Sequence, residues 1–144
     1  MIYRQAKLQD LPQMVELAAE AVSAEDIGVP VCKDTIKANL AECIGSPQHF
    51  AWVAEDAGKL VAAVVSRVST MAWSSKKCAN GLMWFTRQPG TCMPLLRKLS
   101  EWLRSRPGIK VATLECVSPS PSMRRAMSRL GFARESTNLV YVRS

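Results

Sequence analysis

The sequence predicts an α/β (α+β) fold in which one mixed sheet of six to seven strands is flanked by about four helices. Three observations lead to this prediction. Apolar residues recur at helical spacing in four segments, short runs rich in Val, Ala, Phe and Trp lie between them, and two pairs of such runs are joined by turns. Helices interleaved with strands and hairpins are typical of a mixed sheet covered by helices.

Four helices are expected from their apolar spacing and from the residues that begin or end them. Asp10, Asp34 and Thr91 are expected N-caps, whereas Gly45 and Gly131 are expected to end helices. The expected helices cover residues 10–23, 34–44, 91–104 and 123–130.

The clearest hairpin joins residues 49–55 to residues 59–70 across Asp56-Ala57-Gly58, a turn sequence that suits two antiparallel strands. A closing hairpin is expected from residues 133–136 and 139–142. Residues 71–79 are polar and basic and are expected to form a loop. The remaining strands are expected at residues 2–6, 82–86 and 110–117.

Length and composition predict one domain over residues 1–144, long enough to bury a core. The balance of 48% hydrophobic and 22% charged residues is ordinary for a globular protein. No stretch approaches the roughly 20 apolar residues that a membrane span needs. The N-terminus also lacks a signal-peptide pattern, so we expect a cytoplasmic protein with no membrane contact.

The formal charge of +7 favours anionic partners such as nucleotide cofactors, nucleic acids or acidic proteins. The basic residues are spread along the chain, so nucleic-acid binding rests on charge alone and is not the favoured interpretation. The five cysteines include no C-x-x-C pair and His49 is the only histidine, so no metal site is expected. Buried free thiols in a reducing compartment are the expectation.

The most informative segment is Arg87-Gln88-Pro89-Gly90-Thr91-Cys92, which lies between an apolar run and an amphipathic helical segment. The order is therefore strand, glycine turn, helix. The N–H groups and the positive dipole end at a helix start suit a phosphate, and Gly90 would let the backbone approach it closely. Many such turns bind nothing, so the motif alone leaves both interpretations open.

With these segments placed in order, the chain resembles the GNAT superfamily of N-acetyltransferases over nearly its whole length. Arg87 to Cys92 is similar to the acetyl-CoA signature Gln/Arg-x-x-Gly-x-Gly/Ala. The opening at residues 2–10, Trp52-Val53-Ala54-Glu55 and Arg129-Leu130-Gly131-Phe132 resemble the family's first elements, second strand and fourth-helix end. The order and spacing together are more specific than any single motif.

The resemblance implies an acetyl-CoA-dependent N-acetyltransferase that acts on a primary amine, of a small molecule or protein, by direct attack. Pantetheine would lie between residues 82–86 and 110–117 and pair with the first of them as an added strand. The pyrophosphate would sit on the amides of residues 87–92, and an amide near Trp84 or Phe85 would polarise the thioester carbonyl. The implied cofactor-binding residues are Trp84, Phe85, Thr86, Arg87, Gln88, Gly90, Thr91, Cys92 and Ser120.

Four features depart from the family pattern. Cys92 stands where the family has Gly or Ala, so its side chain would crowd the cofactor, and Pro89 lacks an amide donor. The link between strand and glycine turn is short. Met127 occupies the place of the common tyrosine acid. These departures favour the alternative, a catalytically inactive GNAT-fold binding or assembly protein such as a phage encodes.

The candidate catalytic residues are Glu55 and Glu115 as general bases and Tyr141, from the last expected strand, as a replacement acid. Glu55 and Tyr141 each have a structural alternative: Glu55 flanks the hairpin turn, and Tyr141 packs on an edge strand. Ser120 stands where relatives carry a cofactor-side Asn, but a serine before Pro121 is also an ordinary N-cap.

Further residues have weaker patterns. Cys116 is expected to be a buried, inert strand thiol, and His49 a surface or packing residue. Arg124 and Arg125 either reach the cofactor's phosphates or form a solvated helix face. The acceptor is expected to be selected by residues 20–50 and 68–80, and exposed strand edges are compatible with a homodimer.

Overall fold

The structure is a computed structural model that describes residues 1–25, 28–116 and 120–143. Within these residues the sheet has five strands, in the spatial order β1-β2-β3-β4-β5. Neighbouring strands from β1 to β4 are antiparallel, and β5 runs parallel to β4. The strands are β1 (Ile2–Gln5), β2 (Phe50–Asp56), β3 (Lys59–Thr70), β4 (Lys77–Thr86) and β5 (Ile109–Thr113).

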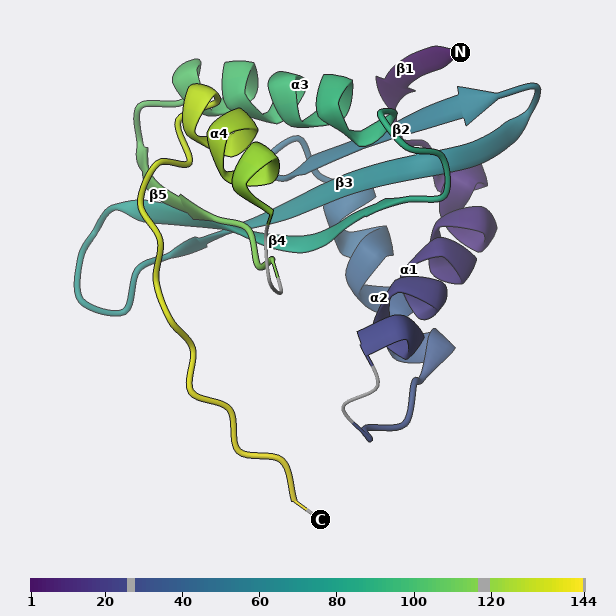
Figure 1. The fold of residues 1–144 in the computed structure, drawn as a ribbon, viewed down its shortest axis with the longest axis horizontal. Coiled ribbons are helices and arrows are strands. Elements are labelled where there is room, and N and C mark those ends of the chain that lie inside the picture. Colours follow the sequence, from purple (N-terminus) through teal and green to yellow (C-terminus); the bar gives the residue numbers. More distant parts are fainter. Residues whose placement is uncertain (26–27, 117–119, 144) are drawn as a thin grey trace.

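Helices cover both faces of the sheet. The helices are α1 (Leu11–Glu25), α2 (Lys33–Ile44), α3 (Cys92–Arg104) and α4 (Pro121–Arg129), and a 3-10 turn, Leu8–Asp10, precedes α1. As Figure 1 shows, α3 and α4 lie on one side of the sheet and α1 and α2 on the other. No helix in the described part of the chain is long and apolar enough to cross a membrane.

The core is divided into two apolar clusters, one on each face of the sheet, because successive strand residues point to opposite faces. Val53, Ala63 and Val65 pack towards α1 and α2. Their strand neighbours Ala54 and Ala62 pack towards α3 and α4. The helices contribute wholly buried side chains to these clusters, namely Met14, Leu17, Leu95, Leu96 and Leu99.

The hairpin between β2 and β3 is confirmed, and its turn has Ala57 at φ 52° and Gly58 at φ 81°. Two positive φ values in succession match the turn that strand twist favours in two-residue hairpins. The helix positions are confirmed to within a few residues, but Asp10 does not begin α1. It ends the 3-10 turn, and its carboxylate accepts bonds from the Lys7 amide at 2.7 Å and from the Arg4 guanidinium at 2.7 and 2.9 Å.

Two predicted boundaries are wrong. β4 begins at Lys77 rather than residue 82, because its pairing with β3 continues back to the Thr70–Lys77 pair. The last three residues of the expected loop 71–79 are therefore in the strand. β5 ends at Thr113 rather than residue 117; it is largely exposed, and it is the edge strand of the sheet that the described residues form.

The prediction of six to seven strands is also wrong, since the described residues after α4 form no closing hairpin. Residues 133–136 and 139–142 are extended but unpaired. Two contacts hold the first part of this tail: Arg124 pairs with Glu135 at 2.8 Å, and Asn138 donates to the Glu115 carboxylate at 3.2 Å. An isolated two-stranded hairpin is only marginally stable in water. The alternation of apolar and polar residues in the sequence was therefore not enough to predict whether this hairpin forms.

Candidate functional site

The site is built around the place where β4 and β5 separate. The two strands pair from Lys77 to Asn80 on β4, and at the last pair Thr113 Oγ1 donates to Asn80 Oδ1 at 3.0 Å. One residue further, Leu114 lies over Gly81, where an added Cβ would be 2.7 Å from Leu114 Cδ2. The split between β4 and the chain after β5 begins here.

A β-bulge accompanies the split. Val65 of β3 pairs with Met83 and Ser66 pairs with Gly81, so the intervening Leu82 of β4 has no partner on β3. An extra residue on one strand bends that strand and increases its twist. The bulge lies directly after the last β4–β5 pair, Asn80 with Thr113, so the edge of residues 82–86 on that side has no strand partner among the described residues.

One side chain crosses the split. Trp84 Nε1 donates to the Glu115 carbonyl oxygen at 2.6 Å. Trp84 packs partly against the cluster under α3 and α4, whereas its neighbour Phe85 packs against the cluster under α1 and α2. Only Trp84 of this pair is therefore placed to bridge the two separated segments.

The turn after β4 is held by a small hydrogen-bond network. Thr86 Oγ1, Thr91 Oγ1 and the Gln88 carbonyl oxygen lie 2.6 Å from one another. The Gln88 amide donates to Thr86 Oγ1 at 3.0 Å, and the Thr91 amide donates to the Gln88 carbonyl at 3.2 Å. Thr91 occupies the N-cap position of α3, but its hydroxyl closes this network instead of capping the helix, which corrects the prediction.

Several amides at the start of α3 bond to no acceptor in the described part of the chain, and this group is called the cradle below. The Arg87 amide is used, since it donates to the Val61 carbonyl at 2.8 Å. Pro89 and Pro94 have no N–H. The amides of Gly90, Cys92 and Met93 have no acceptor within the described part of the chain. They lie at the N-terminus of a 13-residue helix, where the dipole favours an anion.

Gly90 keeps this cradle open. Its φ is +85°, a conformation that L side chains rarely adopt, and no atom lies within 4 Å of an added Cβ. The Cys92 side chain does not fill the space, because it packs against the cluster between α3 and the sheet. Burial there raises the pKa of the Cys92 thiol to about 12. The thiol therefore lies under the helix rather than over the turn.

Arg87 brings a positive charge to the turn, but the charge is already paired. Arg87 Nε lies 2.8 Å from Glu20 Oε2 of α1, and the two side chains are 42% and 53% exposed. Exposed pairs of this kind contribute little to stability, so an incoming anion can compete for the guanidinium. Glu20 was not a candidate from the sequence, because nothing in the local pattern links α1 to this turn.

The three predicted catalytic residues lie in different places. Glu115 is exposed beside the split, where its Oε1 accepts the bond from Asn138. Glu55 lies on β2, and its Oε2 accepts from Arg4 Nε at 3.2 Å, so it joins the first two strands. Tyr141 is 81% exposed on the unpaired tail, not on a strand. The structure brings only Glu115 to the split.

The residues predicted near α4 have structural roles. Ser120 caps the helix, since its Oγ accepts from the Met123 amide at 3.1 Å, as its alternative interpretation predicts. Met127 is 9% exposed in the cluster beneath α4, and its thioether has no proton to donate. Arg124 pairs with Glu135, as described above.

Two further expectations were tested by the fold. Cys116 is exposed beyond the end of β5, so the prediction of a buried strand thiol is wrong. His49 is a packing residue: its Nδ1 accepts from the Val68 amide at 2.9 Å and its side chain is 8% exposed. The described residues contain no group of three or more His, Cys, Asp or Glu side chains placed to hold a metal ion.

Gly81 is the site residue that sequence reasoning missed although a signal was present. An isolated glycine inside a strand pattern indicates a bulge or a close backbone approach. Both occur here, since Leu114 covers Gly81 and Leu82 is the bulged residue.

Comparison with solved structures identifies the fold. A predicted acetyltransferase with acetyl-CoA from Clostridium acetobutylicum superposes with a TM-score of 0.75 at 15% identity, covering 99% of this chain and 95% of that chain. Glucosamine-6-phosphate N-acetyltransferase from Arabidopsis thaliana gives a TM-score of 0.69 at 15% identity, covering 98% and 97%. Ribosomal-protein-alanine N-acetyltransferase from Brucella melitensis gives 0.67 at 16% identity, covering 99% and 97%.

No protein-family model matches the sequence, and no curated protein sequence matches it. The similarity is therefore carried by the arrangement of the elements over almost the whole chain. The chain has the fold of the GNAT N-acetyltransferases, which confirms at the level of architecture the resemblance stated from its motifs.

Proposed function

We propose that this chain is an acetyl-CoA-dependent N-acetyltransferase that acts on a primary amine. The junction of β4 and α3 carries the proposal, because an open strand edge leads there into three amides that lack acceptors among the described residues. A ligand that fits has an extended amide-containing arm joined to a diphosphate, which is the chemistry of coenzyme A. One of the similar structures is described with acetyl-CoA.

The amides of Gly90, Cys92 and Met93 would hold the diphosphate. Two independent observations support the fit: the space above Gly90 is open, and the Cys92 side chain is turned into the core. Arg87 would add a charged contact once a phosphate competes with Glu20 for its guanidinium. Thr86, Gln88 and Thr91 would act indirectly, by keeping the turn in one shape.

The edge of β4 over residues 82–86 would pair with the pantetheine arm as an edge strand pairs with an added one. The Trp84 bridge stands in this path, so the indole must release the Glu115 carbonyl or lie against the arm. A hydrogen bond of this kind contributes a net stabilising free energy of about 1 kcal/mol. Its loss is therefore a small cost beside the contacts that replace it.

When bound, acetyl-CoA supplies an acetyl group activated as a thioester. Glu115 is the candidate base that the split favours, because its carboxylate is exposed there and is oriented by Asn138. It would accept the amine proton directly or through water. Glu55 is less suited to this role, since its carboxylate is paired with Arg4 two strands away from β4.

Acetyl-CoA titration followed by calorimetry tests the cofactor assignment. Binding is expected for the wild-type chain and is expected to be lost in Gly90→Asp, which places a carboxylate in the cradle. Gly58→Asp is the matched control, because Gly58 also has a positive φ (+81°) and open space but lies in the β2–β3 turn. Glu20→Gln should bind more tightly, because it leaves Arg87 unpaired. Absence of binding to the wild-type chain would refute the assignment.

A second candidate is a GNAT-fold protein that binds without catalysis. Met127 favours it, because the buried thioether stands where a proton donor is expected, and the Trp84 bridge favours it by spanning the split. An assay of acetyl transfer to a panel of amines, in which the released thiol of coenzyme A is detected, distinguishes the enzyme from the protein that only binds. Turnover that depends on Glu115 supports the enzyme, whereas cofactor binding without turnover supports the second candidate.

A further inference from the structure

A cavity with a basic lining lies at the end of the sheet where β4 begins. Its volume is about 330 Å³, within the range of small-molecule sites. Lys76 and Lys77 line it from the β3–β4 turn, Arg106 lines it from the turn between α3 and β5, and Gln48 lines it from the connection before β2. No carboxylate lines this basic cavity among the residues that the structure describes. The cavity therefore favours an anion.

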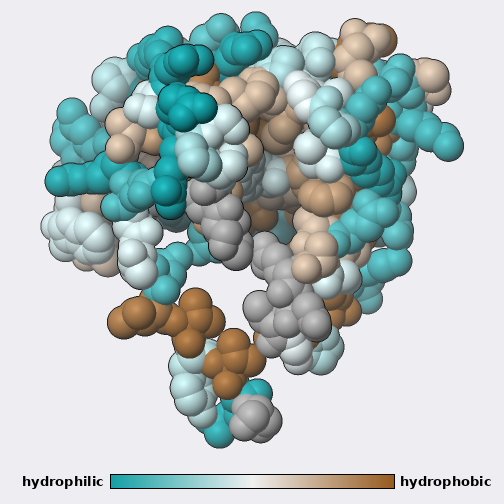
Figure 2. Space-filling view, viewed as in Figure 1, coloured by the Kyte–Doolittle hydropathy of each residue, from teal (hydrophilic) through white to brown (hydrophobic). Residues whose placement is uncertain are grey.

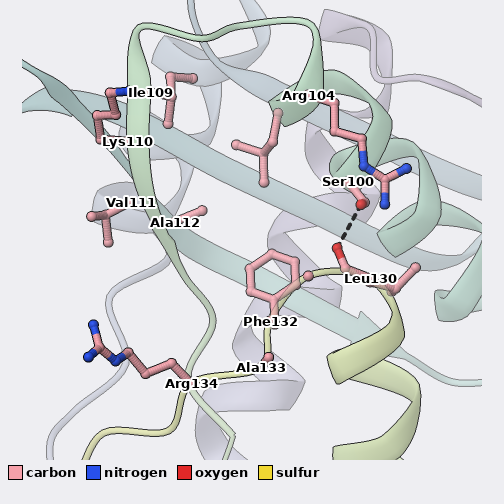
Figure 3. A pocket seen from close by; sticks show the side chains of 12 residues that line it. Ser100, Arg104, Ile109, Lys110, Val111, Ala112, Leu130, Phe132, Ala133 and Arg134 are labelled. Atoms are coloured by element: carbon pink, nitrogen blue, oxygen red, sulfur yellow. Dashed lines mark hydrogen bonds between the residues drawn. The ribbon is translucent and has the colours of Figure 1, made fainter.

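Positive charge extends around the basic cavity. A neighbouring groove shares Ile109 with it and runs between β5, α3 and the residues after α4 (Figure 3). The lining of that groove is mainly apolar but includes three more cations, Arg104, Lys110 and Arg134. Figure 2 shows hydrophilic side chains over the left side of the molecule, where the β3–β4 turn lies, whereas hydrophobic ones stand out on the C-terminal tail. The charges at this end attract an anion before it reaches the cavity.

The guanidinium of Arg106 is held in place where it lines the cavity. It lies 4.6 Å from the centre of the Trp102 ring of α3, and its Nη2 donates to the Pro47 carbonyl oxygen at 3.1 Å. Neither contact neutralises its charge. A guanidinium matches the geometry of a phosphate group through two parallel hydrogen bonds. Arg106 is therefore oriented before a ligand arrives.

Lys76 and Lys77 belong to a turn that is anchored by backbone hydrogen bonds. The Met71 amide donates to the Lys76 carbonyl at 3.0 Å, and the Lys77 amide donates to the Gly108 carbonyl at 3.1 Å. The second bond ties the β3–β4 turn to the turn that carries Arg106. None of the three cations pairs with a carboxylate in the described part of the chain. Their charges therefore repel one another until an anion binds.

The basic cavity is separate from the cradle. The cavity adjoins Lys77, the first residue of β4, whereas the cradle follows Thr86, the last residue of that strand. Nine steps of about 3.3 Å along the strand put about 30 Å between them. In Figure 1 the β3–β4 turn and the α3–β5 turn lie on the left, and the turn before α3 lies on the right. One diphosphate therefore cannot contact both places.

We propose that the basic cavity is a second anion site, which binds a diphosphate group through Lys76, Lys77 and Arg106. The cations come from two different turns, so two linked phosphate groups can reach both, whereas a single group would leave one turn uncompensated. The diphosphate is either free pyrophosphate or part of a nucleoside diphosphate. Trp73 lies in the same turn as the lysines and is 81% exposed, which makes its ring available to a base. The inference does not depend on the proposed function.

Pyrophosphate titration followed by calorimetry tests the site in a Gly90→Asp chain, whose cradle carries a competing carboxylate. One pyrophosphate is expected to bind per chain. Lys77→Gln and Arg106→Gln should each weaken binding by about tenfold or more, which corresponds to about 1.4 kcal/mol or more. Arg106→Lys should also weaken it, because an ammonium lacks the planar fork. Lys37→Gln is the matched control, since it removes the same charge from an exposed position of α2 that does not line the cavity.

Two comparisons define the ligand. Inorganic phosphate should bind more weakly than pyrophosphate, because it reaches only one of the two turns. If ADP binds more tightly than pyrophosphate and Trp73→Ala removes the difference, the source is a nucleoside diphosphate. If ADP has no advantage, the source is pyrophosphate. Either result supports the site.

Nuclear magnetic resonance of the wild-type chain tests the location without any substitution. The amide signals of Lys77 and Gly108 are expected to shift when pyrophosphate is added. Three results would overturn the inference: pyrophosphate shifts neither signal, Lys77→Gln and Arg106→Gln leave its affinity unchanged, or Lys37→Gln weakens binding as much as they do. Circular dichroism checks that each variant keeps its fold.

Discussion

Replacing Gly81 by alanine tests the geometry from which the split begins. Carbon atoms in contact lie about 3.5–4.0 Å apart, whereas the new methyl would be 2.7 Å from Leu114 Cδ2 and 3.2 Å from the Thr113 carbonyl oxygen. Leu114 must therefore move by roughly 1 Å, the difference between these distances. Overpacking of this kind costs about 1–3 kcal/mol. The alanine also lowers the conformational entropy of the unfolded chain, which raises the free energy of unfolding by about 0.4–1 kcal/mol.

The expected result is a Gly81→Ala chain that is less stable than wild type by up to about 2.5 kcal/mol, the difference between these two ranges. Gly108→Ala is the matched control, because Gly108 has neither a positive φ nor an atom within 4 Å of an added Cβ. It should be about 0.4–1 kcal/mol more stable than wild type. Urea unfolding followed by circular dichroism measures both, with the slope used to check that the transition remains two-state. If the two variants shifted stability in the same direction, the close approach of Leu114 to Gly81 would be wrong.

Two other predictions concern titrating groups. Iodoacetamide should alkylate Cys32 well before Cys92, because a hydrogen bond with Thr35 lowers the pKa of the exposed Cys32 thiol while burial raises the pKa of the Cys92 thiol to about 12. Mass spectrometry after a short pulse of reagent measures both alkylation rates. Equal rates would contradict the burial of Cys92. Arg4 holds the pKa of Asp10 below its usual value. The carboxylate therefore contributes fully to the free energy of unfolding above its unfolded pKa of about 4. This contribution is lost as the pH falls through the lower pKa of the folded state. Asp10→Asn should cost about 2 kcal/mol at neutral pH and reduce the loss of stability in acid; urea unfolding across pH would disprove this if the acid dependence were unchanged.

Local patterns predicted most of the elements correctly. The hairpin across residues 56–58, the glycine turn before α3 and the Ser120 cap each depend on residues close together in sequence, and the structure contains all three. The closing hairpin failed because alternation shows only that a segment can be a strand. Whether it pairs depends on contacts with the rest of the sheet, and residues 139–142 pair with no strand in the described part of the chain.

The sequence by itself determined the order of the elements as far as α4, the α/β class and the position of the glycine turn before α3, because backbone propensity, glycine conformation and missing proline donors are local properties. Only the tertiary structure decided which amides of the turn remain without acceptors, that the Cys92 thiol is buried, that Trp84 crosses the split and that Arg4 engages Glu55. These outcomes depend on contacts between residues far apart in the chain, such as Trp84 with Glu115 and Arg4 with Glu55. Such contacts are set by how the sheet bends and packs, and no short stretch of sequence encodes that.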